Sequence, residues 1–221
     1  MSTRAPVSLP TRAVVDTVVL RYFLFVDQAE LLLQLLGRPI VVPEAVYSTQ
    51  DEHVENEQLL SEMVRSIRWH ERFACDQRRP RDKRDQADRL ASRLALVHEL
   101  VARGDVVVEQ LSETELSLFA RLTSIEHVAE YNIVAPLGTG EAACIAIAHE
   151  RSLTLVTDDN DGLRAFGEVS GGGVYERIRR LLVRAADEGH IDRGQANLIH
   201  REMVELGFYD RAAPFPAAER D

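Results

Sequence analysis

Short apolar runs alternate along the chain with longer stretches in which apolar residues recur at helical spacing. The short runs are rich in β-branched residues and cover 13–17, 39–42, 105–110 and 153–157. The helical stretches cover 18–36, 43 to about 73, 90–103, a segment beginning at 112, 138–150, 174–188 and 192–206. Parallel neighbouring strands need helical crossovers between them. The pattern therefore predicts an α/β fold, with helices on both faces of a central parallel sheet.

Residues typical of helix starts and ends support several of these boundaries. Gly37 follows the first helical stretch, where a glycine can satisfy the last helical carbonyls. Pro43 opens the second stretch, where its missing N–H has no consequence, and we expect this helix to run, with or without a break, to about Phe73. Ser112 and Glu115 have the spacing of a capping box and predict another helix start.

Polar segments divide the chain into regions. With 221 residues and about 150 residues per domain, we expect one domain over 12–210. Residues 1–11 are predicted to form a polar leader and 211–221 a tail. Residues 76–93 are dominated by charged side chains and predict a loop or an exposed helical insertion.

Composition narrows the classes of protein. Apolar residues make up 45% of the chain and charged residues 28%, as in ordinary globular proteins. The 26 basic and 36 acidic residues give a net charge of −10, which argues against a broad basic surface for nucleic acid but not against a local one. Every basic residue except Lys83 is an arginine, which suits phosphate recognition. Because the two cysteines give no disulfide framework and no apolar run could span a membrane, we expect a cytoplasmic protein without a membrane partner.

Acidic residues follow two of the predicted strands. Asp16 ends the first run, Asp158 and Asp159 follow the last, and Glu141 opens the helix that leads into it. If these strands are neighbours in a parallel sheet, their carboxylates converge at one edge, where Mg²⁺ or Mn²⁺ would relieve the repulsion. Such a site can lower the pKa of a bound water for phosphodiester hydrolysis. The alternative is that each acid simply caps a helix or favours its dipole.

Four motifs in order carry a family resemblance. AVVDT, PEAVY, GTGEAACIAIA and LVTDD together resemble the PIN-domain family, and most closely its bacterial toxin-type ribonucleases. The likeness covers about 12–210, with 60–105 the least family-like stretch. It implies a PIN-like three-layer α/β/α sandwich with a central parallel sheet, a helical insertion and C-terminal helices. It also implies a ribonuclease that depends on Mg²⁺ or Mn²⁺ and acts on an RNA substrate.

The same resemblance suggests residue roles and partners. Asp16, Glu141 and Asp159 match the family's catalytic, metal-binding acids, Thr157 matches the hydroxyl residue before the last acid, and Asp161 is a further candidate metal ligand. No other cofactor is expected. If the protein is the toxin of a toxin–antitoxin pair, a small antitoxin protein should cover the acidic cleft; a homo-oligomer is also compatible with the sequence.

One departure from the family pattern bears on activity. An acid commonly follows the P-x-x-V helix start, but here Pro43 and Val46 are followed by Thr49. Glu52 lies one helical turn after that position, and Glu44 lies one turn before the neighbours of Val46; either could substitute geometrically, and neither is assigned. The gap leaves open an alternative function, a non-catalytic PIN-like module that only binds a partner protein.

A second alternative is a dinucleotide-binding, Rossmann-like protein. GTGEAA matches G-x-G-x-x-A, and Asp158 follows it at a suitable distance. Against this interpretation, Glu141 would place a negative charge where the pyrophosphate must lie, and Asp16 would have no role.

Basic and aromatic residues give no clear nucleic-acid signal. The basic residues of 78–84 are interleaved with acids, and those of 177–184 recur at helical spacing, so both are expected to be solvated faces. Trp69 is expected to lack the aromatic neighbours of a base-stacking platform. Cys144 lies in an alanine-rich helix and is expected to be buried and inert.

Overall fold

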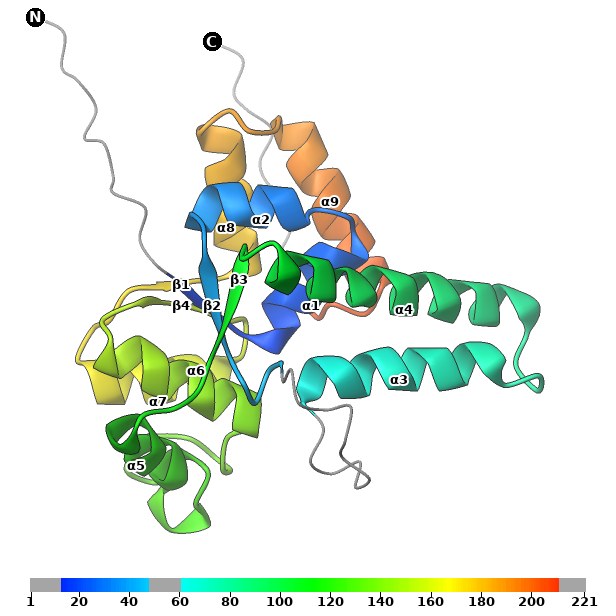
Figure 1. Ribbon diagram of the computed structural model, residues 1–221. Coiled ribbons are helices and arrows are strands. Elements are labelled where there is room, and N and C mark those ends of the chain that lie inside the picture. Colours follow the sequence, from blue (N-terminus) through cyan, green and yellow to red (C-terminus); the bar gives the residue numbers. More distant parts are fainter. Residues whose placement is uncertain (1–12, 48–60, 211–221) are drawn as a thin grey trace, which may run out of the picture.

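The β-branched runs form a sheet of five parallel strands in the computed structural model, which describes residues 13–47 and 61–210 (Figure 1). The strands are β1 (Ala13–Val15), β2 (Ile40–Pro43), β3 (Val106–Glu109), β4 (Thr154–Val156) and β5 (Tyr175–Glu176). Their spatial order is β3-β2-β1-β4-β5, and all neighbours are parallel. The predicted α/β fold with a central parallel sheet is confirmed. The predicted leader and tail lie outside the described residues.

Strand β1 lies at the centre of the sheet, between β2 and β4. Val14 pairs with Val41 of β2 on one side and with Leu155 of β4 on the other. The chain builds the sheet outward from β1 through β2 to β3 and then returns to the opposite side with β4. Ligand sites in open parallel sheets form at such a reversal, beyond the carboxyl ends of the strands.

Helices cover both faces of the sheet (Figure 1). One side carries α5 (Glu113–Leu122), α6 (Thr139–Glu150) and α7 (Asn160–Ser170), and the other α1 (Thr17–Phe25), α2 (Ala29–Leu36), α8 (Ile178–Asp187) and α9 (Arg193–Glu205). Residues 142–148 of α6 are all buried, Cys144 among them as predicted, and small alanines let the helix pack closely on β1, β2 and β4. No helix in the described part of the chain is long and apolar enough to cross a membrane.

Two predicted helices are divided in the structure. The stretch 18–36 breaks into α1 and α2 because Asp27 adopts a left-handed backbone conformation with φ 61°. The helix predicted from Pro43 does not start there: Pro43 ends β2 and the chain turns, and the next described helix begins after Ser61. Local periodicity could not locate either break.

The polar insertion is helical. Helices α3 (Glu62–Cys75) and α4 (Arg81–Ala102) form a hairpin that extends to one side of the sheet, and α4 packs against α1 (Figure 1). Helix α4 begins inside the charged stretch 76–93, so the helical form of the predicted insertion is correct. A short 3₁₀ helix, Ile125–His127, follows α5, and the two-residue strand β5 was not predicted.

The predicted capping box fixes the start of α5. Ser112 Oγ accepts a hydrogen bond from the Glu115 N–H at 3.3 Å, and Glu115 Oε2 accepts one from the Ser112 N–H at 2.7 Å. Glu115 is only 1% exposed, and its other oxygen accepts a hydrogen bond from Arg151 Nε at 2.6 Å. Because Arg151 lies directly after α6, this ion pair joins the start of α5 to the end of α6.

Candidate metal centre

Five carboxylates line one cavity of about 520 Å³ beyond the carboxyl ends of β1 and β4, and one of them, Asp158, pairs with Arg177 at 3.3 Å. The other four are the candidate cation ligands. They come from four separate segments: Asp16 from the end of β1, Glu62 from the start of α3, Glu141 from the start of α6, and Asp159 from the β4–α7 connection. The cavity lies where the strand order reverses. The topology therefore brings the three sequence-predicted acids to the same cavity and adds a fourth.

Asp16 combines a capping role with a place in the cavity. One carboxylate oxygen accepts a hydrogen bond from the Thr17 N–H at 2.7 Å and the other accepts one from the Thr157 hydroxyl at 3.0 Å. The residue is 6% exposed. Burial, followed by the negative charge of Glu62, raises the pKa of Asp16 from 3.8 to about 6.

Glu62 is the acid that the sequence analysis missed. Ser61 caps α3, accepting a hydrogen bond from the Val64 N–H at 3.4 Å, and so places Glu62 in the first helical turn. The Glu62 carboxylate accepts hydrogen bonds from the Thr17 hydroxyl and, at 3.3 Å, from the Gly140 N–H. The signal that could have found it is the Ser-Glu pair of a helix start, which is hidden when 43–73 is read as one helix.

The other substitutes considered from the sequence do not fill this place. Glu44 lies in the turn after β2, where its N–H donates to the Glu109 carbonyl at 2.9 Å, and it does not line the cavity. Thr49 and Glu52 lie outside the described residues.

Glu141, in the first turn of α6, carries a carboxyl group whose pKa is strongly raised. Burial, then the negative charges of Asp159 and Asp16, raise its pKa from 4.5 to about 8. The nearby Asp159 side chain also raises this pKa, and the nearby Gly162 backbone lowers it. Within the described residues, Glu141 Oε1 is buried and has no hydrogen-bond partner of ordinary geometry. A buried carboxylate oxygen without a partner is unfavourable unless a proton or a cation satisfies it.

Asp159 is the N-cap residue of α7 and lines the same cavity. Its Oδ1 accepts hydrogen bonds from the N–H groups of Asp161 at 2.7 Å and Gly162 at 3.3 Å. Its own N–H donates to the Thr157 hydroxyl at 3.2 Å. Thr157 therefore connects the end of β4 to Asp16 as well as to Asp159, and it is fully buried.

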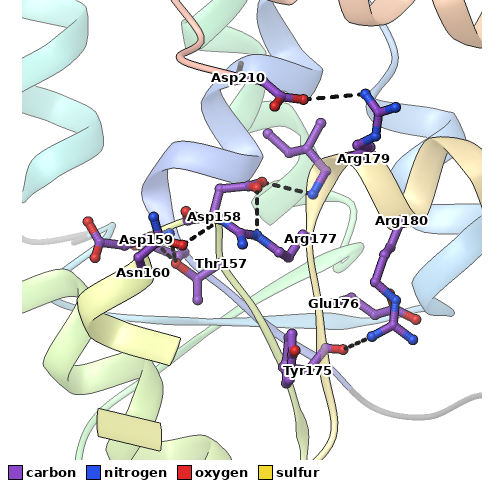
Figure 2. A network of polar contacts seen from close by, with 12 residues as sticks. Thr157, Asp158, Asp159, Asn160, Tyr175, Glu176, Arg177, Arg179, Arg180 and Asp210 are labelled. Atoms are coloured by element: carbon purple, nitrogen blue, oxygen red, sulfur yellow. Dashed lines mark hydrogen bonds and ion pairs between the residues drawn. The ribbon is translucent and has the colours of Figure 1, made fainter. Parts of the chain in front are cut away.

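The two other acids of this segment pair with arginines, Asp158 at the wall of the cavity and Asp161 outside it. The Asp158 carboxylate accepts hydrogen bonds from Arg177 at 3.3 Å and from the Ile178 N–H at 2.8 Å, and Figure 2 shows it turned toward Arg177 while Asp159 lies on the other side of the chain. Asp161, predicted as a peripheral ligand, pairs with Arg164 at 2.8 Å and does not line the cavity. Arg177 also donates to Asn160, which holds the β4–α7 connection (Figure 2).

Two glycines make room for the carboxyl groups. A Cβ at Gly140 would lie 2.6 Å from Glu62 Oε2, and a Cβ at Gly162 would lie 2.0 Å from Glu141 Oε1. Real Cβ atoms do not approach other atoms this closely, so any side chain at either position would displace the neighbouring carboxylate. The positions of Glu62 and Glu141 thus depend on the absence of side chains beside them.

Arg21 is a cation in the same cavity. It lies on α1, one helical turn after Thr17, and lines the cavity wall. No carboxylate of the described residues pairs with it, and its Nε is buried without a hydrogen-bond partner. An unpaired arginine beside acids is a ready contact for an anionic ligand.

The carboxylates surround the cavity without converging on one point. No three His, Cys, Asp or Glu side chains of residues 13–47 and 61–210 are placed so that they could hold a metal ion together in this arrangement. Within the cavity, the negative charges of Glu62 and Asp159 raise the pKa of Asp16, and those of Asp159 and Asp16 raise the pKa of Glu141. A dication there requires side-chain movements that bring the oxygens together.

The glycine segment before α6 lacks the context of a dinucleotide fingerprint. Gly138 and Gly140 follow the connection that comes after α5, rather than a strand, and Glu141 faces the acidic cavity. Comparison of the chain with protein-family models, curated proteins and solved structures gives no match. The site is therefore interpreted from its own geometry.

Proposed function

We propose that this protein is a divalent-cation-dependent ribonuclease of PIN type, with Asp16, Glu62, Glu141 and Asp159 around its cation. The observation that carries the proposal is the meeting of these four carboxylates in one cavity at the reversal of strand order, with the half-buried Glu141 holding one oxygen, Oε1, buried and without a hydrogen-bond partner among the described residues. A structural cluster of caps would not need an acid whose pKa is raised to about 8.

The donor set fits a hard cation. Carboxylate oxygens are the ligands that Mg²⁺ and Mn²⁺ accept, and Glu141 Oε1 is an oxygen available to one. When bound, the cation would supply Lewis-acid activation of a water and of the scissile phosphate. Thr157 orients Asp16 through its hydroxyl, and Thr17 orients Glu62 in the same way.

Glu62 also bears on the question of activity. The sequence has Thr49 where an acid is common in the resembling family, which left a non-catalytic binding module as an alternative. Glu62 brings a fourth carboxylate to the cavity from the following helix, so the acidic set does not depend on position 49. This observation favours the catalytic function over the binding module. A small antitoxin that covers the cavity remains part of the proposal as a partner.

The experiment compares two glutamates. Purified protein is incubated with single-stranded RNA and Mn²⁺, and cleavage is followed for the wild type, Glu62→Gln and the matched control Glu44→Gln. We expect Glu62→Gln to slow cleavage by at least about 100-fold, because cation-mediated stabilisation of the transition state is worth several kcal/mol. Glu44→Gln should cleave like the wild type, since Glu44 does not line the cavity.

Cation binding separates the two candidate functions. Titration calorimetry with Mn²⁺ should show binding to the wild type and to Glu44→Gln, and much weaker binding to Glu62→Gln. Absence of both Mn²⁺ binding and cleavage in the wild type would contradict the proposal and favour the protein-interaction module. Equal cleavage by all three proteins would remove Glu62 from the site.

A further inference from the structure

Helix α3 leads from the carboxylate cavity to an exposed basic and aromatic surface. Its first residue, Glu62, lines the cavity. Beyond it, Arg65, Arg68, Trp69 and Arg72 recur at i, i+3, i+4 and i+7, the spacing that aligns side chains on one face of a helix. We call these four residues the α3 face. The opposite side of the helix, with Met63 and Ile67, is buried against the rest of the hairpin.

Trp69 is the aromatic centre of this surface. It is 57% exposed, although tryptophan is usually mostly buried. The Phe73 ring lies 5.2 Å from it at an interplanar angle of 30°, and the His70 ring lies 4.8 Å away, edge-on. Arg79 stacks on the Phe73 ring, with its guanidinium carbon 4.6 Å from the ring centroid. The expectation that Trp69 lacks aromatic neighbours is therefore wrong: the helical spacing of 69 and 73 brings the rings together.

The arginines of the α3 face include unpaired charges. In the described part of the chain, no carboxylate pairs with Arg65 or Arg68, whereas Arg79 pairs with Asp76 at 3.6 Å. In a protein with net charge −10, the exposed Arg65 and the half-buried Arg68, which pair with no carboxylate of the described residues, are a local departure from the overall balance. Such cations suit a polyanion, and an exposed ring beside them suits a base.

Arg21 joins this face to the cavity. It lines the carboxylate cavity from α1, and its charge acts on His70 of α3: burial, and then Arg21, lower the pKa of that imidazole. His70 in turn contacts Trp69. Cationic and aromatic groups therefore follow one another from the cavity wall to the middle of α3.

We propose that the α3 face binds single-stranded nucleic acid, with a base stacked on Trp69, phosphates on Arg65 and Arg68, and the strand directed past Arg21 into the cavity. A single strand is the fitting ligand because its bases are free to stack on a side chain while its backbone stays accessible to cations. The direction toward the cavity rests on the proposed ribonuclease function; the binding itself requires neither cation nor cleavage.

The tryptophan count makes the test specific. Trp69 is the one tryptophan in the sequence, so intrinsic tryptophan fluorescence reports on this position alone. With EDTA present, the protein is titrated with single-stranded RNA, DNA of the same sequence and an abasic oligomer, each of about twelve nucleotides, within the usual range of single-strand sites. Oligomers with bases should quench the fluorescence at saturation, and the abasic oligomer should quench it far less. RNA and DNA titrations show which strand is preferred.

Variants separate stacking from charge, with affinity read by anisotropy of labelled oligomers. Trp69→Ala should weaken binding of base-containing oligomers by about tenfold and leave abasic binding unchanged. Arg65→Gln with Arg68→Gln should weaken both, and reduce the slope of log affinity against log salt by about 0.7 for each phosphate that is no longer neutralised. Arg201→Gln, an exposed arginine of α9, is the matched control and should bind like the wild type.

The outcomes are distinct from those of the cleavage assay. Binding that depends on Trp69 and the two arginines in EDTA supports the proposal even if no RNA is cleaved in Mn²⁺. Binding unaffected by these variants, when thermal unfolding shows that each is folded, overturns it whether or not the cavity cleaves RNA. No binding of any oligomer at low salt also overturns it.

Discussion

Replacing Glu141 by glutamine should stabilise the cation-free protein while removing a ligand from its site. Glu141 is half-buried beside Asp16 and Asp159, and its pKa is raised from 4.5 to about 8. The folded protein therefore binds a proton that the unfolded chain releases between these values, so stability falls as pH rises through this window. Glutamine keeps the size of the protonated acid, replaces its O–H donor by N–H donors, and cannot ionise.

The size of the effect follows from the same pKa values. At about 1.4 kcal/mol per pH unit, the interval between 4.5 and about 8 corresponds to at most about 5 kcal/mol of unfolding free energy. Because water and neighbouring groups adjust when the carboxylate ionises, about 2–3 kcal/mol is a reasonable expectation. Most of this stability difference between Glu141→Gln and the wild type should be present at about pH 9. Little of it should be present at about pH 5, where folded Glu141 is protonated.

Urea unfolding with EDTA at several pH values measures this difference. The wild type should lose more stability than Glu141→Gln between pH 5 and pH 9, with similar dependence on urea in both proteins. Glu150→Gln, at the exposed end of α6, is the control and should follow the wild type. In a separate measurement without EDTA, Mn²⁺ at pH 8 should raise the unfolding free energy of the wild type but not that of Glu141→Gln. Parallel pH profiles for the wild type and Glu141→Gln would refute the assignment of a strained, ionisable group to this position.

Two further predictions concern residues around the site and the frame that holds it. Gly162→Ala should displace the flexible Glu141 carboxyl group and so weaken Mn²⁺ binding, measured by calorimetry, by about tenfold or more. Gly167→Ala in the same helix is the control, because a Cβ at Gly167 would have nothing within 4 Å. This variant should bind Mn²⁺ like the wild type, and its unfolding free energy in urea should rise by up to about 1 kcal/mol. Wild-type binding by Gly162→Ala would contradict the close contact. Arg151→Gln should lower the unfolding free energy by about 2 kcal/mol at pH 7, because the pKa of buried Glu115 is lowered chiefly by its hydrogen bond with Arg151. This loss should shrink as pH falls below 4.5; a pH-independent loss would show that packing, rather than charge, is responsible.

The order of strands and helices could be read from the sequence because burial imposes a strong pattern there. The runs that became β1, β2 and β4 are fully buried between helices, and acids directly after such strands have few places to go except the common edge. That reasoning points to Asp16 and to the acids after β4, and the family resemblance selects Asp16, Glu141 and Asp159. All three line one cavity.

The features that the sequence does not reveal depend on where helices are interrupted and on how distant segments pack together. Glu62 reaches the cavity because a new helix begins at Ser61, and periodicity alone does not show where one helix ends and the next begins. The left-handed backbone at Asp27 and the two-residue strand β5 leave similarly faint traces. Asp161 was counted as a ligand from proximity along the chain, whereas its nearest cation, Arg164, is one turn away on the same helix.

The glycines beside Glu62 and Glu141 have a consequence for how the site tolerates sequence change. Part of the information that positions its acids is carried by residues without side chains, so a saturation library selected for activity should favour glycine at positions 140 and 162, though less strictly than it retains the four acids. The site in a divergent chain would then be identified by six positions, the four acids and the two glycines, rather than by the four acids alone. A search for such chains by their acids alone would accept proteins in which a single methyl group has already closed the space for one of the carboxylates.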